Sequence, residues 1–230
     1  MNNTHPTGAN PPILTPINSI GQALMALLKS PARLIQALHE DPSIKLPAGL
    51  TVFGLVALAC YGLIIGSFSG GHQTWIAALK ISLGTLMSFA ICLPSLFIFA
   101  CLSGAEVTLR SVLGILSAIL ALTALLLVGF IPVAWVFSQS TDSLALVGAL
   151  HLLFWLVAIG FALRLLKRLL ETLQIRDWRH IKIWMVILIL VSLQMSTALR
   201  PLLGQSNNPF PMEKKFFITH WSEHIFTSTH

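Results

Sequence analysis

Five long runs of apolar residues constrain the fold of this chain more than any other feature. Each run is close to the ~20 residues that a helix needs to cross the hydrocarbon core of a bilayer. They cover residues 46–68, 75–102, 109–136, 143–163 and 183–199. A spanning segment must satisfy its own backbone hydrogen bonds, which a helix does and an open strand does not. The sequence therefore predicts an all-α fold, a polytopic membrane helix bundle with five transmembrane helices.

Composition agrees with this prediction. Hydrophobic residues make up 55% of the chain and charged residues 10%, whereas soluble domains are about 25% charged. The net charge of +6 lies beside the apolar runs, where basic residues set topology and meet anionic lipid. We therefore expect membrane lipids as partners and no nucleic acid. Cys60, Cys92 and Cys101 are odd in number and lie within apolar runs, so we expect small buried hydrophobes rather than disulfides.

The segment before the first run divides into two parts. Residues 1–14 are polar and proline-rich, without the charged and apolar regions of a signal peptide, and we expect a disordered tail. Thr15-Pro16 and Ser30-Pro31 each resemble a helix start. Residues 15–45 thus predict one or two amphipathic helices that lie in the membrane interface on the cytoplasmic side. In the alternative, the same helices pack on the bundle.

Local signals mark the boundaries of the middle runs. The second run would be about 42 Å long as a helix, longer than the ~30 Å core, so it must tilt, protrude or break. Pro94 is the expected break point. Ser103 and Glu106 have the spacing of a capping box, which predicts the start of the third helix. Pro132 lies near the far end of that helix.

The fourth run continues into a basic amphipathic segment, residues 164–176. Leucines alternate there with basic residues, and we expect a cytosolic helix on the inner leaflet that attracts anionic lipid. Its lipid-surface residues are Arg164, Lys167, Arg168 and Arg176.

The distribution of basic residues predicts the orientation. With five spans and the amino terminus inside, ten of the 14 Lys and Arg residues lie on the inner side and four on the outer side. The positive-inside rule then places the amino terminus in the cytoplasm and the carboxyl terminus outside. Trp75, Trp135, Trp178 and Trp184 lie near the predicted interfaces, as in an aromatic belt.

Lys80 is the feature most suggestive of a binding site. It lies one and a half turns into the second run, on the outer side. Residues predicted at similar depth would form with it a basic, amide-rich corner that suits a lipid phosphate or another anion. The members of this corner are Lys80, Arg200, His72, Gln73 and Gln194. In the alternative, Lys80 only extends its ammonium group to the interface.

Other intramembrane residues favour packing. Gly62 and Gly66 have the spacing that lets two helices approach closely in lipid. His151 is expected to bond to a neighbouring helix. The apolar runs contain no Asp or Glu, which weakens an ion-coupled transporter or a proton relay as the function.

We expect residues 201–230 to form an outer amphipathic tail, and one pattern within it is of chemical interest. His220, Glu223 and His224 read H-x-x-E-H, an arrangement of zinc ligands and general base found in some metalloproteases. In the alternative, the tail lies on the outer leaflet through its aromatic residues. We expect no cofactor.

The order of parts resembles that of bacterial members of the Yip-domain superfamily. The residues that carry this resemblance are Leu28-Lys29-Ser30-Pro31, Tyr61-Gly62 and Leu93-Pro94-Ser95-Leu96. The phrase from Leu199-Arg200-Pro201 to Trp221 is similar to a signature of uncharacterised bacterial multispan membrane proteins. The resemblance implies a role in membrane organisation or trafficking rather than catalysis.

These features together predict a non-enzymatic integral membrane protein of the bacterial inner membrane. It would act as a scaffold, an assembly subunit or a membrane-organising factor, with other membrane or cytosolic proteins as partners. The alternative is a transporter or lipid-handling protein that uses Lys80 and Arg200. A more remote alternative is a zinc site at His220 and His224.

Overall fold

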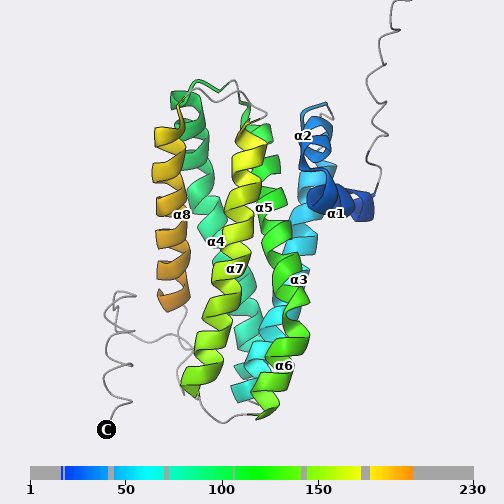
Figure 1. Cartoon of the computed structure of the whole chain (residues 1–230), viewed down its shortest axis with the longest axis vertical. Helices are drawn as coiled ribbons and strands as arrows, with labels where there is room; N and C mark the ends of the chain where they lie inside the picture. The colour runs from blue at the N-terminus through cyan, green and yellow to red at the C-terminus, as the bar shows by residue number, and fades with distance from the viewer. Residues whose placement is uncertain are drawn as a thin grey trace, which may run out of the picture.

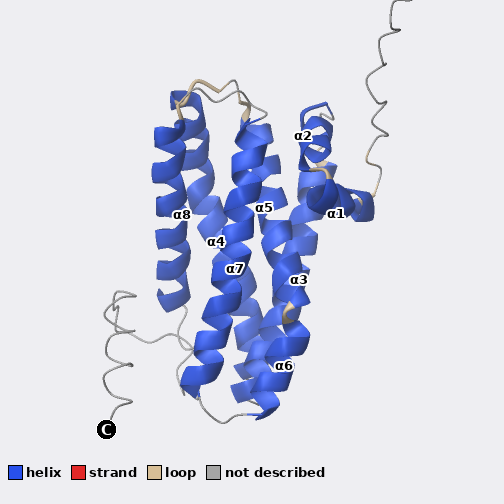
Figure 2. Ribbon diagram, in the orientation of Figure 1, coloured by secondary structure: helices blue, strands red, loops and turns tan. Residues whose placement is uncertain are grey.

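The computed structural model describes residue 17 and residues 19–40, 44–69, 73–105, 107–140, 144–171 and 177–198. These parts of the chain form eight α-helices and contain no strand (Figure 2). The helices are α1 (Ile20–Lys29), α2 (Pro31–Glu40), α3 (Lys45–Ser69), α4 (Gln73–Leu102), α5 (Leu109–Gly129), α6 (Ile131–Ser140), α7 (Leu144–Glu171) and α8 (Trp178–Ala198).

The five longest helices, α3, α4, α5, α7 and α8, run side by side along the long axis of the molecule (Figure 1). We name the two ends of this bundle after the short helices that lie there. The carboxyl-terminal ends of α4 and α7 also lie at the α2 end, and the end of α3 and the start of α4 lie at the α6 end (Figure 1). Helix α1 lies crosswise on the flank of the bundle, toward the α2 end (Figure 1).

Four of the described helices, α3, α4, α5 and α7, are long and apolar enough to cross a membrane. The predicted all-α fold and multi-pass membrane class are thereby confirmed. The predicted count of five spans depends on α8, which is not among these four. With 21 residues, α8 is about 31 Å long, and the fifth span stays a proposal.

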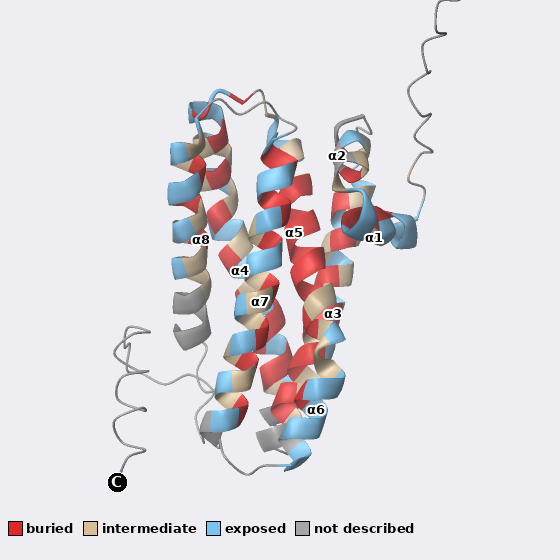
Figure 3. Cartoon of the chain, viewed as in Figure 1, coloured by how far each residue is buried: buried red, intermediate tan, exposed pale blue. Residues whose placement is uncertain are grey.

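Helix α5 is the centre of the bundle. Of its apolar stretch, 72% is buried, compared with 39% in α3, 22% in α4 and 28% in α7. Figure 3 shows the same contrast, with α5 buried along most of its length and the outer faces of its neighbours exposed. Because no water reaches the hydrocarbon core, apolar outer faces are expected on a membrane bundle, where they contact lipid.

The contact between α3 and α4 depends on two glycines. A Cβ atom on Gly62 would lie 2.6 Å from the Cα of Ala78, and one on Gly66 would lie 2.6 Å from the Cα of Thr74. Both neighbours are backbone atoms, which cannot move aside cheaply. The predicted close approach at Gly62 and Gly66 is therefore confirmed, and it joins α3 to α4.

The predicted capping box at Ser103 is wrong. Ser103 instead belongs to the end of α4, where Gly104 adopts a φ of 78°. The amide of Gly104 donates to Cys101 O and that of Ala105 to Ala100 O, which is the Schellman pattern of a helix end. Helix α5 begins later, with Thr108 as its cap accepting a bond from the amide of Ser111 at 3.2 Å.

The predicted single helix over residues 109–136 is also wrong. It is divided at Phe130 into α5 and α6. Pro132 lacks the amide hydrogen that would bond to Val128 O. The amide of Phe130 lies near three carbonyls of the last turn, those of Leu126, Leu127 and Val128. The chain thus closes one helix before it starts the next.

Two other predicted boundaries change. Helix α4 continues through Pro94 instead of breaking there. Residues 144–171 form one helix, α7, so the basic segment continues the fourth run, as the sequence predicted. Helix α1 begins at Ile20 with Ser19 as its cap, later than the predicted Thr15-Pro16, whereas α2 begins at Pro31 as predicted.

Candidate functional site

A buried tyrosine and a buried histidine meet in the half of the bundle nearer the α6 end. Tyr61 of α3 has no exposed surface and His151 of α7 is 6% exposed. The Tyr61 hydroxyl lies 2.9 Å from Nδ1 of His151, and the two rings meet edge to face with centroids 5.7 Å apart. His151 therefore does bond to a neighbouring helix, as the sequence predicted.

The second ring nitrogen of His151, unlike Nδ1, is buried without a hydrogen-bond partner in the part of the chain that the structure describes. This nitrogen is Nε2. Phe154 packs edge-on against the imidazole and stacks on Phe130, with centroids 4.5 Å apart. A polar nitrogen in such an apolar, aromatic environment costs free energy unless something bonds to it.

Lys80 lies at a similar depth in the bundle. It is seven residues from the start of α4, as His151 is from the start of α7, so each is about 10 Å from the α6 end. Lys80 is only 7% exposed. A lysine that only extends its ammonium group to the interface would be more exposed than this. Tyr61, His151 and Lys80 thus form a polar layer at one depth of the bundle. The hydroxyls of Ser82 and Thr123, also buried in this half, donate to backbone carbonyls.

The rest of the predicted corner is not placed. Arg200 and His72, and the side chains of Gln73 and Gln194, lie outside the described residues. The register between α4 and α8 is known, because the indole of Trp184 bonds to α4 at Cys92 and Ser95. Ala198 of α8 is 14 residues from Trp184, and Lys80 is 12 residues from Cys92. In an antiparallel pair these offsets of about 21 and 18 Å bring the end of α8 to the depth of Lys80.

Trp184 itself was predicted in an aromatic belt, and this prediction is wrong. The residue has no exposed surface. Its Nε1 donates to Cys92 O at 3.2 Å and to Ser95 Oγ at 3.0 Å. A buried indole N–H needs such a partner, and α4 offers carbonyl and hydroxyl acceptors next to Pro94. By contrast, Trp75 is 71% exposed and Trp135 is 47% exposed, as a belt requires.

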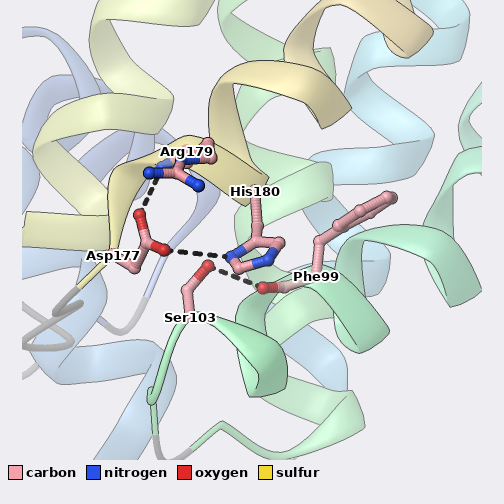
Figure 4. Close-up of polar contacts among 5 residues, drawn as sticks. All are labelled: Phe99, Ser103, Asp177, Arg179 and His180. Atoms are coloured by element: carbon pink, nitrogen blue, oxygen red, sulfur yellow. Dashed lines mark hydrogen bonds and ion pairs between the residues drawn. The ribbon is translucent and has the colours of Figure 1, made fainter.

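A polar cluster lies at the α2 end where α4 meets α8 (Figure 4). The two helices are joined there by the amide of Asp177, which donates to Ser103 O at 3.4 Å. Asp177 precedes α8 and its Oδ1 accepts a bond from the amide of Arg179 at 2.8 Å, as in a helix cap. Its Oδ2 lies 3.5 Å from Nδ1 of His180. The Ser103 hydroxyl donates to Phe99 O at 2.7 Å. Serine, histidine and aspartate are thus close together, but each bond serves a helix end and the arrangement is structural.

The basic segment of α7 has two faces of opposite character. Leu165, Leu166, Leu169 and Leu170 are buried in the core at the α2 end together with leucines of α2. The leucine face is therefore covered by protein and does not insert into a leaflet. Arg164, Lys167 and Arg168 are exposed on the opposite face. Arg176, the last predicted lipid-surface residue, lies outside the described part of the chain.

Sequence reasoning missed Tyr61 as a site residue. A signal for it existed, because it is the only tyrosine of the chain and a phenol within an apolar run needs a hydrogen-bond partner. No group of three or more candidate metal ligands occurs among the described residues. The predicted zinc ligands His220 and His224 lie outside these residues.

No family model, curated protein or solved structure matches this chain. The resemblance to the Yip-domain superfamily accordingly stays a prediction.

Proposed function

We propose that this chain is a non-enzymatic scaffold or assembly subunit of the bacterial inner membrane, with five spans and a cytoplasmic amino terminus. The observation that carries the proposal is the placement of charge. Of the ten described Lys and Arg residues, nine lie at the α2 end, and the other is Lys80. By the positive-inside rule the α2 end is then cytoplasmic.

The exposed faces of three helices support this orientation. Toward the α2 end, the outward residues change from apolar to basic at Lys45 of α3, at Arg164 of α7 and at Lys182 of α8. A membrane boundary requires such a change at a similar level on each span. Beyond Lys182, the exposed face of α8 carries the apolar residues Ile183, Val186 and Leu190. This apolar outer face supports α8 as a fifth span.

The α2 end also supports a role in protein contacts. Helix α2 and the last turns of α7 bury their leucines in the same core cluster as α5 and α8, so the α2 end is a packed body next to the predicted headgroup level. Such a body gives a partner a rigid surface with a surrounding basic rim. In this proposal the cytoplasmic surface at the α2 end binds the partner.

The test is cross-linking in intact membranes, followed by purification in mild detergent and mass spectrometry. Arg110→Glu with Arg179→Glu reverses two exposed charges at the α2 end. Gln139→Glu with Ser140→Glu adds two negative charges at the α6 end as the control. We expect one protein at constant ratio to the chain, lost with the first pair and kept with the second. Equal recovery with both pairs, or no such protein, contradicts the proposal.

The polar layer favours a second candidate, a transporter or lipid-handling protein. Lys80 is nearly fully buried about 10 Å from the α6 end, and an ionisable residue in a span is by default a functional candidate. Arg200 would complete an anion site if it followed the end of α8 to this depth.

Vesicles with a fluorescent phosphatidylglycerol in one leaflet test this candidate. Movement of the lipid between leaflets, above protein-free vesicles and lost in Lys80→Met, supports it. Equal rates with wild-type protein and protein-free vesicles remove lipid movement as the function.

A further inference from the structure

One continuous stripe of exposed residues runs the length of α7 and changes character within a single turn. From the α6 end it begins with apolar or small residues and finishes with charged ones. The members are Leu146, Ala149, Leu153, Leu156, Gly160, Phe161, Arg164, Lys167, Arg168 and Glu171. The apolar part, Leu146 to Phe161, rises about 22 Å, most of the ~30 Å hydrocarbon core.

The turn where the stripe changes has a defined geometry. The guanidinium carbon of Arg164 lies 5.4 Å from the centroid of the Phe161 ring, on its face. This cation–π contact holds Arg164 at the boundary. Lys167 and Arg168 follow on the same face within about 6 Å of rise, so the three cations can approach one group.

The charge of this face is positive overall. Lys167 has an exposed carboxylate, Glu171, at 3.8 Å. Within the described ranges, no ion pair joins Arg164 or Arg168 to an acid. The opposite face of the segment is buried in leucines, so α7 presents these cations on a fixed helix and not on a mobile loop. Three cations and one carboxylate leave a net charge of +2 on this face.

We infer that the stripe on α7 binds one anionic phospholipid of the cytoplasmic leaflet, with its phosphate on Arg164, Lys167 and Arg168 and its acyl chains along Leu153, Leu156 and Phe161. The inference deepens the proposed function, since it uses the same membrane orientation. Arginine matches phosphate with paired N–H donors, and lysine adds a point charge.

The order of apolar and basic residues along the stripe indicates which kind of ligand binds there. A phospholipid carries its phosphate directly above its acyl chains, and the stripe has cations directly above an apolar track. A free phosphate would use only the basic turn, and an acidic peptide would leave the apolar track to other molecules. Only the lipid matches both parts at once.

The test counts bound lipid by native mass spectrometry after reconstitution into nanodiscs of phosphatidylcholine and phosphatidylglycerol and extraction in mild detergent. The test variant is Arg164→Gln with Lys167→Gln and Arg168→Gln. The matched control, Arg110→Gln with Arg179→Gln and Lys182→Gln, removes three exposed charges from the same end of the bundle. Glu171→Gln removes the one carboxylate of the face.

We expect the test variant to retain at least tenfold less phosphatidylglycerol than the wild type, since each basic residue near an anionic lipid contributes about fivefold. The control should retain wild-type amounts, and Glu171→Gln should retain more. Equal losses in test and control variants overturn the inference, as does no loss in either. Displacement of the lipid by equimolar glycerol phosphate also overturns it, because the apolar track would then contribute nothing.

The lipid count is measured in detergent and does not depend on membrane orientation. A failed orientation experiment would therefore leave it unchanged, and the two outcomes can be told apart.

Discussion

The hydroxyl of Tyr61 and Nδ1 of His151 lie 2.9 Å apart, and this bond crosses from α3 to α7 in the half of the bundle nearer the α6 end. It brings together residues 90 positions apart in the chain. Both rings are buried, so neither can exchange this bond for one with water. The bond therefore links α7 directly to α3, although the backbone of α7 packs mainly on α5.

Tyr61→Phe should lower stability by about 0.6–1.7 kcal/mol, the range for hydrogen bonds between membrane helices. The ring stays and only the hydroxyl is lost, so packing hardly changes. Thermal unfolding in detergent measures the effect. A double-mutant cycle with His151→Phe should give a coupling energy of the same size. A coupling energy of zero would mean that the two side chains only pack together.

Gly62→Ala should destabilise the chain by about 1–3 kcal/mol, because the added methyl group meets the Cα of Ala78 at 2.6 Å. Gly160→Ala is the matched control, since a Cβ there has nothing within 4 Å. Unfolding of both variants in the same detergent gives the comparison. Equal stabilities would contradict a close contact of α3 and α4.

Trp184→Phe should weaken the attachment of α8 to α4. It removes the donor to Cys92 O and Ser95 Oγ, and we expect a loss of about 1 kcal/mol. Ser95→Ala should cost less, because Cys92 O remains as an acceptor. Limited proteolysis after α7 reports the release of α8. If Ser95→Ala released α8 more readily than Trp184→Phe, the indole would not be the anchor.

The sequence predicted the elements whose signals are local. Apolar runs located α3, α4 and α7, Ser30-Pro31 located the start of α2, and the spacing of Gly62 and Gly66 identified a helix contact. Each of these depends on a few neighbouring residues. The same local reading failed at Ser103, where two signals compete. The serine and glutamate spacing favours a helix start, but Gly104 can adopt a positive φ and closes α4 instead.

Contacts between distant helices were harder to predict. Trp184 looks like a belt residue from its position near the end of a run, and only the packing of α8 on α4 buries it. Likewise, the leucines of α7 suggest insertion into lipid, but α2 covers them. The choice between lipid and protein as the apolar partner depends on tertiary packing, which periodicity does not contain.

Reporter fusions test the central claim, that this is a five-span protein with the α2 end in the cytoplasm. Fusions after Gly104 at the α2 end, after Gln139 at the α6 end and after His230 are compared in intact cells. We expect Gly104 to read cytoplasmic and both Gln139 and His230 to read external. A cytoplasmic His230 would remove α8 from the spans, and an external Gly104 would reverse the orientation and contradict the account.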